Sequence, residues 1–223
     1  MANGAAAPAN QRLERADGPP QNEDGRFRRS MRTQRAVLDA FLELINEGDL
    51  APTAQRIADR SGASLRTVFH QFSDLDTIHK LAGQRLLAQI ERTGRAVPAQ
   101  GPLDRRIDLY VANRVTLMKA FHRPASAARL REPFSATLRQ NRDFFLALGD
   151  QEIRHVFARE LGELPDDTRP VLVRSIALVS NWAAWYSLVE EFGLDVEAAT
   201  DVIRGSLRAV LGLRRPFTAR ADP

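Results

Sequence analysis

Cysteine is absent from the 223-residue sequence, and histidine occurs only four times. Without cysteine, the chain has no disulfide bond, no catalytic thiolate and no cysteine-held zinc or iron–sulfur cluster. The histidines are His70, His79, His122 and His155, and no two of them have the i, i+4 spacing of a helical metal site. The sequence therefore predicts neither a metal nor another cofactor.

A large excess of one charge is also missing. The 32 lysines and arginines face 28 acidic residues, so the net charge of +4 does not by itself identify a polyanionic partner. The most apolar segment, 171–189, contains Arg174 as its only charged residue. It is about long enough to cross a bilayer, but its serines, its asparagine and the absence of a signal peptide favour a helix buried in protein. We expect a cytoplasmic protein without a membrane partner.

Apolar residues recur at helical spacing through most of the chain, and strand-like alternation is short. Residues 1–25 are too polar to bury much surface and are predicted to form a disordered tail, so structure should begin near Arg26. The predicted fold class is all-α. Helices are predicted over an apolar stripe at 37–45, over 54–60 and 64–70, from a capping box at Ser73–Asp76 to Thr93, and over 103–122, 125–131, 134–161, 167–192 and 195–212.

The short helix pair in 53–72 has the layout of a helix-turn-helix. Thr53 caps its first helix, Ile57 and Ala58 face inward, and Gly62 supplies the positive φ that the turn requires. Ser64 caps the second helix, whose apolar set is continued by Val68. The outward residues of this second helix are all polar: Ser64, Arg66, Thr67 and His70. Such a face offers hydrogen-bond donors and acceptors to the edges of DNA bases.

Five arginines precede this pair, at positions 26, 28, 29, 32 and 35, with no acidic residue between them. A cluster of this kind neutralises phosphates in nucleic-acid-binding proteins. The alternative is an ordinary helical hairpin with a solvated charged end, which the pattern alone leaves open.

Residues 30–80 resemble the N-terminal domain of the tetracycline-repressor (TetR) family of bacterial regulators. The resemblance is carried by the run Thr53…Ile57-Ala58…Ser61-Gly62-Ala63-Ser64…Thr67-Val68-Phe69-His70-Gln71-Phe72-Ser73. It implies a three-helix DNA-binding domain at 26–75 and a larger helical domain for effector binding and dimerisation at 76–223. It also implies that Ser64, Arg66, Thr67 and His70 reach bases or phosphates of double-stranded DNA, that Thr53 and Gln71 contact its backbone, and that Arg32 and Arg35 bind flanking phosphates.

Three positions depart from the family pattern. Phe69 stands where tyrosine is usual, which removes a hydroxyl that bonds phosphate. Leu75 replaces a frequent lysine, whose role Lys80 takes in part. Arg66 replaces a small residue, and an arginine there would read guanine and alter the operator sequence.

The helices predicted after residue 103 carry aromatic and amphipathic side chains. These either pack in a core or surround a largely apolar cavity for a small-molecule effector, with polar groups from residues such as Asn113, Arg114 and His155. Asn181 is the most informative of these, because an amide buried beside tryptophans needs a partner, which is either a ligand or the protein itself. The candidate cavity residues are Asn113, Met118, Phe121, Asn141, Phe145, Asn181, Trp182 and Trp185.

Helices 167–192 and 195–212 are the predicted dimer contacts, because pairing this hairpin with its copy makes a four-helix bundle. The preferred hypothesis is a dimeric repressor that binds a palindromic operator and is released by an effector. One alternative is a helical enzyme or metabolite-binding protein, but the sequence has no phosphate loop and no Gly-x-Ser-x-Gly motif, so we expect no enzyme. Another is an architectural DNA-binding protein without an effector.

Overall fold

The computed structural model describes residues 21–93 and 96–212, and it confirms the all-α fold class, since these residues contain helices and no strand. The helices are α1 (Gln21–Asn46), α2 (Ala54–Ser61), α3 (Leu65–Gln71), α4 (Leu75–Thr93), α5 (Leu103–Arg131), the short 3-10 turn η1 (Glu132–Phe134), α6 (Ala136–Val156), α7 (Ala158–Gly162), α8 (Arg169–Val179), α9 (Trp182–Tyr186), the π-helical turn η2 (Ser187–Glu191) and α10 (Val196–Val210).

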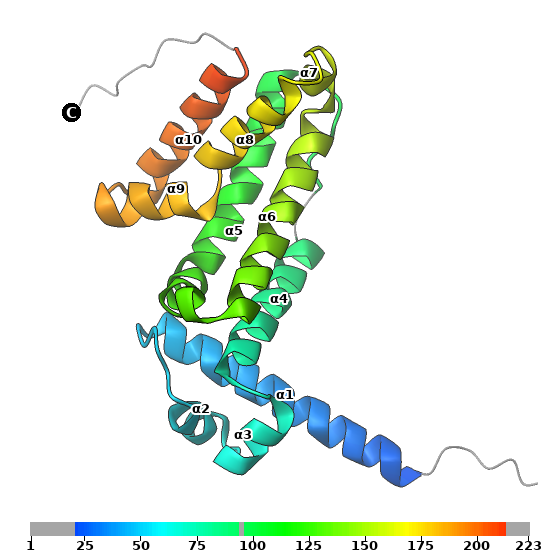
Figure 1. The fold of residues 1–223 in the computed structure, drawn as a ribbon, viewed down its shortest axis with the longest axis vertical. Coiled ribbons are helices and arrows are strands. Elements are labelled where there is room, and N and C mark those ends of the chain that lie inside the picture. The colour runs from blue at the N-terminus through cyan, green and yellow to red at the C-terminus, as the bar shows by residue number, and fades with distance from the viewer. Residues whose placement is uncertain (1–20, 94–95, 213–223) are drawn as a thin grey trace, which may run out of the picture.

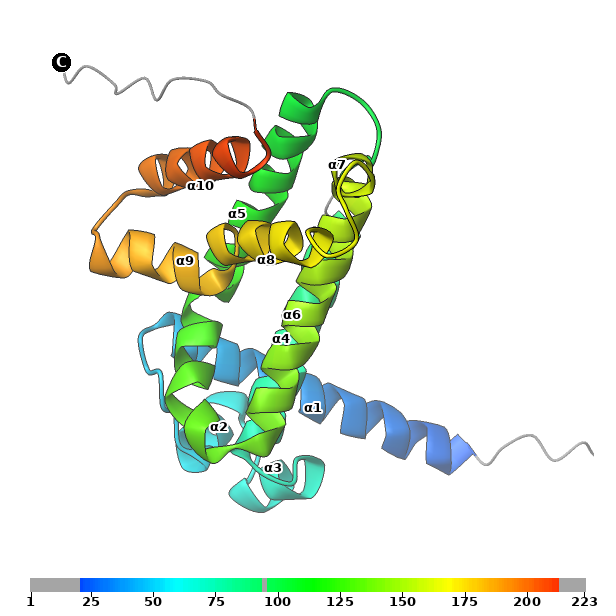
Figure 2. The ribbon, with the colours of Figure 1, turned by 45° about the horizontal axis from the view of Figure 1, so that its top comes forward.

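Helices α1, α2 and α3 form a group at one end of the molecule, and the N-terminal half of α1 projects beyond it (Figure 1). Helix α4 leads from this group to the long pair α5 and α6, which run side by side. Helices α8, α9 and α10 cover the far half of that pair (Figure 2). The chain is therefore elongated, with the helix-turn-helix at one end and the α8–α10 layer at the other.

Two hydrophobic cores hold these groups together. The N-terminal core comes from α1 to α4 and is extended by Ala127 of α5. The C-terminal core comes from α5 to α10. Fully buried members of the first are Phe41, Ile45, Ile57, Val68, Phe72 and Ile78, and those of the second are Ile107, Tyr110, Phe157, Ile176, Trp185 and Ile203.

Helix α4 belongs to the N-terminal core but also packs on α6. Its Ile78 and Ala82 are buried in the N-terminal core. Next to them, Gly83 faces α6, and a Cβ at this position would be 3.7 Å from the ring of Phe145, which is an ordinary van der Waals distance. Helix α4 therefore lies against α6 at this position without a steric requirement for glycine.

A buried arginine fixes the start of α5 to the end of α6. Arg106 is only 2% exposed, and its guanidinium donates to the carbonyl of Val156 at 2.6 Å and to the Glu160 carboxylate at 2.9 Å. It also donates to the carbonyl of Gly101 at 3.2 Å. The charge is therefore paired and its donors are largely satisfied, as burial requires.

The predicted start of structure near Arg26 is wrong, because α1 already includes Gln21–Gly25. The rest of the predicted tail, residues 1–20, lies outside the described residues.

Two predicted helix boundaries in the middle of the chain are also wrong. Helix α5 continues through Pro124, where a break was expected, because Ala127 just beyond it is fully buried in the N-terminal core. That packing offsets the hydrogen bond that proline cannot donate. Conversely, the predicted helix 134–161 is interrupted at Phe157, whose ring is fully buried against Tyr110 at a centroid distance of 5.3 Å.

The predicted helix 167–192 is broken at Ser180. The Ser180 hydroxyl donates to the carbonyl of Ile176 at 2.6 Å, and the Asn181 side chain accepts from the N–H of Ala184 at 2.9 Å, which starts α9. Serine and asparagine compete in this way with the backbone hydrogen bonds of a helix. The apolar composition of 171–189 therefore belongs to three short elements, and no helix within the described ranges is long and apolar enough to cross a membrane.

The predicted capping box at Ser73–Asp76 is replaced by a different cap. The N–H of Thr77 donates to the Asp74 carboxylate at 2.7 Å, while the Ser73 hydroxyl contacts that of Thr77 at 2.9 Å. Asp76 faces away from this cap and accepts from Arg131 of α5 at 2.9 Å. The start of α4 is thus fixed both by its own cap and by an ion pair to the C-terminal end of α5.

His79 is a buried polar group at this junction of α1, α4 and α5. Its ring packs edge-on against Phe41, with a centroid distance of 4.5 Å, and only 7% of the residue is exposed. Burial lowers the pKa of His79 from its usual value near 6.5 to about 4, and the charge of Arg131 adds to this effect against the opposing charge of Asp76.

This lowered pKa predicts a specific loss of stability in acid. As pH falls from 6.5 to 4, the unfolded chain binds a proton at His79 before the folded chain does, so the free energy of unfolding falls. The free energy of unfolding of the wild type should therefore fall by roughly 2–3 kcal/mol more than that of His79→Gln between about pH 7.5 and about pH 4.5. Urea unfolding of both proteins at the two pH values measures this, and equal losses would contradict it.

Candidate nucleic-acid interface and internal cavity

The α2–turn–α3 unit has the local structure that the sequence predicts. Thr53 caps α2 by accepting from the N–H of Arg56 at 3.2 Å, and Ser64 caps α3 by accepting from the N–H of Thr67 at 3.1 Å. Gly62 in the turn has φ of 71°. The inward side chains Ile57, Ala58 and Val68 are buried. The caps and this apolar contact set the orientation of α3 against α1 and α2.

The outward face of α3 is open to solvent. Ser64, Arg66 and His70 are exposed and Thr67 is half-buried. The hydroxyls of Ser64 and Thr67 are 2.7 Å apart, so each holds the other in place. Arg66 and His70 have no side-chain partner among the described residues, and their hydrogen-bonding groups remain free for an external partner.

Helix α3 is also attached to α1 by a polar contact that the sequence did not predict. The Ser30 hydroxyl donates to the side-chain oxygen of Gln71 at 3.1 Å. This contact orients Gln71 at the end of α3 beside the basic segment of α1. No local pattern in the sequence indicates it, because the two residues are 41 positions apart.

Both arginines of α2 form ion pairs with the end of α1 and the loop after it. Arg60 pairs with Glu47 at 2.8 Å and Glu43 at 3.5 Å, and Arg56 pairs with Asp49 at 2.7 Å. Hydrogen bonding to Arg60 lowers the pKa of Glu47. These pairs neutralise the two arginines of α2, so the unpaired basic residues of α1 lie in the earlier part of that helix.

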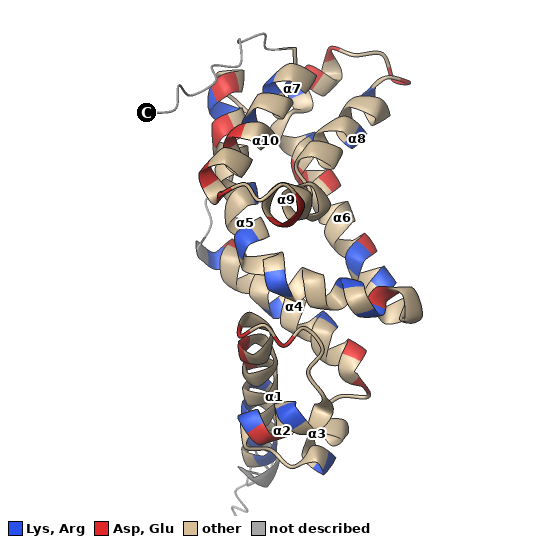
Figure 3. Ribbon diagram, turned by 90° about the vertical axis from the view of Figure 1, so that its left-hand side faces the viewer, with Lys and Arg blue, Asp and Glu red and all other residues tan. Residues whose placement is uncertain are grey.

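That earlier part of α1 includes Arg32 and, near the middle of the helix, Arg35, and both are exposed. Arg32 has no side-chain partner among the described residues, whereas Arg35 is 3.8 Å from Asp39, which pairs more closely with Arg85 of α4 at 2.5 Å. Figure 3 shows basic segments on the lower part of α1 and at α3, at the same end of the molecule. The unbalanced positive charge of the domain is therefore next to the open face of α3.

The three departures from the family pattern lie on α3 and at the start of α4. Arg66 is exposed on α3, and Phe69, which lacks a hydroxyl, is half exposed near the end of the same helix. Leu75 is half-buried at the start of α4. Lys80 is half-buried further along α4 and has no side-chain partner among the described residues.

A cavity of about 900 Å³ lies between α4, α5, α6 and α9. Seven of the eight cavity residues expected from the sequence line it: Asn113, Met118, Phe121, Asn141, Phe145, Asn181 and Trp182. The expectation for Trp185 is wrong, since this side chain is buried in the C-terminal core. His155 is exposed on α6 and does not line the cavity either. The sequence missed the lining residues Phe41, His79 and Gly83, through which the cavity reaches α1 and α4.

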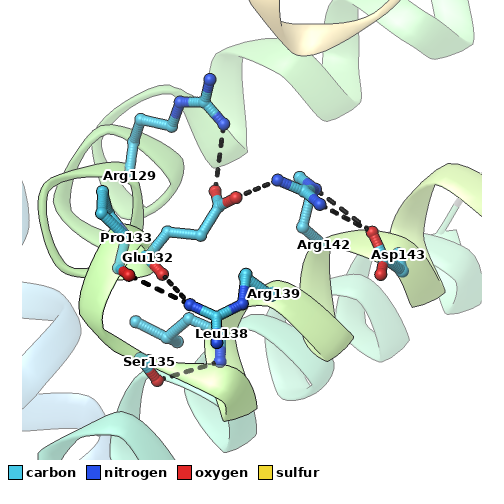
Figure 4. Close-up of polar contacts among 8 residues, drawn as sticks. All are labelled: Arg129, Glu132, Pro133, Ser135, Leu138, Arg139, Arg142 and Asp143. Atoms are coloured by element: carbon cyan, nitrogen blue, oxygen red, sulfur yellow. Dashed lines mark hydrogen bonds and ion pairs between the residues drawn. The ribbon is translucent and has the colours of Figure 1, made fainter.

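Charged groups around the cavity are paired with one another. Glu132, only 8% exposed, accepts from Arg129 at 3.1 Å and from Arg142, which also pairs with Asp143 at 3.0 Å (Figure 4). Arg139 lies below this cluster and donates to the carbonyls of Glu132 and Pro133, each at 3.1 Å. The cluster fixes the turn between α5 and α6 beside the cavity.

A second charged pair lines the cavity nearer the α8–α9 break. Arg114 is 3.6 Å from Glu152 and donates to the carbonyl of Ser180 at 3.1 Å, so it replaces the helical hydrogen bond lost at the break. Burial raises the pKa of Glu152, against the lowering effect of the Arg114 charge.

The amides and the indole of the cavity differ in how they are satisfied. The Asn181 side chain caps α9, so its partner is the backbone of this chain. The side-chain oxygen of Asn141 and the indole N–H of Trp182 are buried without a hydrogen-bond partner in the described structure. Buried groups left in this state are costly, which makes these two the polar groups of the cavity best placed to gain from a ligand.

The described residues contain no cluster of histidine, aspartate and glutamate suited to a metal ion. No protein-family model and no curated protein matches the sequence. Solved structures share its fold. A transcriptional regulator from Rhodococcus sp. Rha1 is 17% identical, with a TM-score of 0.61 over 84% of this chain and 99% of that one. A proposed transcriptional regulator from Pseudomonas aeruginosa PAO1 is 13% identical, with a TM-score of 0.60 over 80% of this chain and 90% of that one.

Proposed function

We propose that the chain is a dimeric, ligand-responsive transcriptional regulator of the tetracycline-repressor type that binds a palindromic operator and is not an enzyme. The observation that carries the proposal is the open polar face of α3, with Arg66 unpaired, beside the acid-free arginine segment of α1. The solved structures of like fold support it, since one is named a transcriptional regulator and the other is a proposed one.

In this proposal α3 is the recognition helix. Arg66 reads a base, and Ser64, Thr67 and His70 contact bases or phosphates. Arg32, Arg35, Thr53, Gln71 and Lys80 bind the phosphate backbone and fix the register of the domain on the duplex. The Ser30–Gln71 hydrogen bond supports this arrangement, since it keeps the arginine segment of α1 at a fixed position relative to α3.

The proposed effector site is the internal cavity. Phe41 of α1 and His79 of α4 line it together with residues of α5 and α6, so a ligand there contacts the helices that carry the helix-turn-helix. A ligand that fits better when α4 is displaced from α6 stabilises that displaced state, through its differential affinity alone. The displacement changes the separation of two recognition helices, which must be about 34–36 Å for adjacent half-sites.

The proposed dimer contact includes the outer face of α8. Val171 and Leu178 are two helical turns apart and are 62% and 68% exposed, whereas Val173 and Ile176 on the other face are buried. An exposed apolar face at the end of the molecule opposite the helix-turn-helix suits a two-fold contact that leaves both α3 helices accessible.

Replacing Arg66 tests whether α3 reads DNA bases. We expect Arg66→Ala to relax the preference at one position of each half-site and to weaken binding by about 1–3 kcal/mol. Selection of bound sequences from a random DNA pool, followed by affinity measurements, gives both results. Arg60→Ala is the matched control, because Arg60 pairs with Glu47 and Glu43 and should leave the base preference intact. No selection of any sequence by the wild type would overturn the DNA-binding role and favour a metabolite-binding protein.

Replacing Arg32 tests the contribution of α1. If Arg32 binds a phosphate, Arg32→Ala weakens all sequences equally and lowers the slope of log K against log salt concentration by about one unit. Fluorescence anisotropy with one selected operator and one unrelated duplex, across a salt series, measures this. A loss confined to the selected operator would assign Arg32 to base reading instead.

Replacing Leu178 tests the dimer contact. We expect Leu178→Arg to shift the chain from dimer to monomer, because it places a charge in the apolar centre of the interface. Sedimentation equilibrium measures the change. Leu130→Arg, at a comparably exposed leucine on α5, is the control and should leave the dimer intact. A wild-type chain that is monomeric at high concentration would contradict the dimer.

A further inference from the structure

We propose that the cavity selects an electrically neutral, largely apolar molecule that carries one hydrogen-bond acceptor for Trp182 and one donor for Asn141, such as an amide with a long hydrocarbon chain. The inference deepens the effector part of the proposed function, and it depends on the charges and polar atoms that line the cavity.

The charges of the wall exclude ionic ligands on energetic grounds. Each of the three lining arginines is already beside a carboxylate: Arg114 beside Glu152, and Arg129 and Arg142 beside Glu132. A charged ligand would compete with these existing pairs, and at Arg114 or Glu152 it would leave the other member without its charged partner in a partly buried site. His79 carries no charge at neutral pH because burial lowers its pKa to about 4. Glu91, the remaining charged lining residue, is exposed and stays solvated.

The interior of the wall is apolar. Its side chains include Leu87, Ile90, Met118, Phe121 and Phe145. A volume of about 900 Å³ is at the upper end of the range for small-molecule cavities, roughly 300–1,000 Å³. A ligand with a hydrocarbon chain buries apolar surface against this lining. That burial is the main contribution to its binding free energy.

Two atoms of lining residues determine the polar part of the ligand. The Trp182 indole N–H is a donor only and the Asn141 side-chain oxygen is an acceptor only, and neither has a partner in the described structure. Both atoms are almost fully covered in the unliganded chain, so the two side chains turn toward the cavity when they pair with a ligand. Asn113, Arg114 and Asn181 have partners within the protein, so they offer less to a ligand. A neutral amide has both a carbonyl and an N–H, and thus pairs with both unsatisfied atoms.

The test uses three probes with the same ten-carbon chain, namely decanamide, decanoate and decylammonium, each below its self-association concentration. Isothermal calorimetry on the full chain without DNA should give at least about tenfold tighter binding of decanamide than of either ion. Trp182→Phe and Asn141→Leu should each weaken decanamide binding about fivefold or more. Trp185→Phe, which changes the core tryptophan, and Asn46→Leu, at an exposed asparagine of α1, should leave it unchanged.

Intrinsic fluorescence gives a second readout, because the chain has two tryptophans and one of them lines the cavity. Decanamide should change the emission of the wild type and of Trp185→Phe, but not that of Trp182→Phe. Melting curves of all variants establish that they fold. Equal or tighter binding of an ion overturns the inference, and so does binding of decanamide that both cavity substitutions leave unchanged.

The same experiment separates this inference from the proposed function. If decanamide binds in the cavity but the chain has no affinity for DNA, the inferred ligand class is supported and the proposed regulatory function is wrong. If the chain binds its operator normally but binds none of the three probes, the proposed regulatory function stands and the inferred ligand class is wrong.

Discussion

The rest of the structure depends on the packing of α4 between two neighbours. On one side Ile78 and Ala82 are buried in the N-terminal core, and His79 packs against Phe41 of α1. On the other side Gly83 touches α6 at Phe145. Because protein interiors are close-packed, α4 cannot shift relative to α6 without carrying the N-terminal core with it. The orientation of the helix-turn-helix relative to the C-terminal helices is thus set mainly by α4, together with the end of α5 that supplies Ala127 and Arg131.

The positions of the arginines matter more than their number. The net charge is only +4, and many arginines are bound within the protein: Arg56 and Arg60 to the α1 end and its loop, Arg106 to Glu160, and Arg208 to Asp104. Arg32 of the α1 segment and Arg66 on α3 have no such partner among the described residues and lie at the same end of the molecule. A local positive field of this kind attracts polyanions whatever the net charge of the chain.

The sequence predicted the features that depend on neighbouring residues, and it failed where distant packing decides. The all-α class, the caps at Thr53 and Ser64 and the turn at Gly62 follow from local chemistry that the structure confirms. Pro124 did not end α5, because buried contacts of Ala127 outweigh a local helix breaker. Likewise, the Glu132 cluster and the Arg114–Glu152 pair join positions with no shared sequence pattern, and Trp185 could not be distinguished from Trp182 without knowing which face of α9 is covered.

The break at Ser180 lies between the cavity and the proposed dimer contact on α8. Arg114, which lines the cavity, donates a hydrogen bond to the carbonyl of Ser180 at the break. Trp182, which also lines the cavity, is the first residue of α9 after the break. A molecule in the cavity thus touches α4, which carries the helix-turn-helix, and the junction of α8 with α9. In the proposed dimer, a shift at either place would change the distance between the two proposed recognition helices, so both half-sites would lose register together. In that proposal a coupling of about 1–3 kcal/mol per ligand, which is ordinary for allosteric proteins, would weaken operator binding without any unfolding of the N-terminal helices.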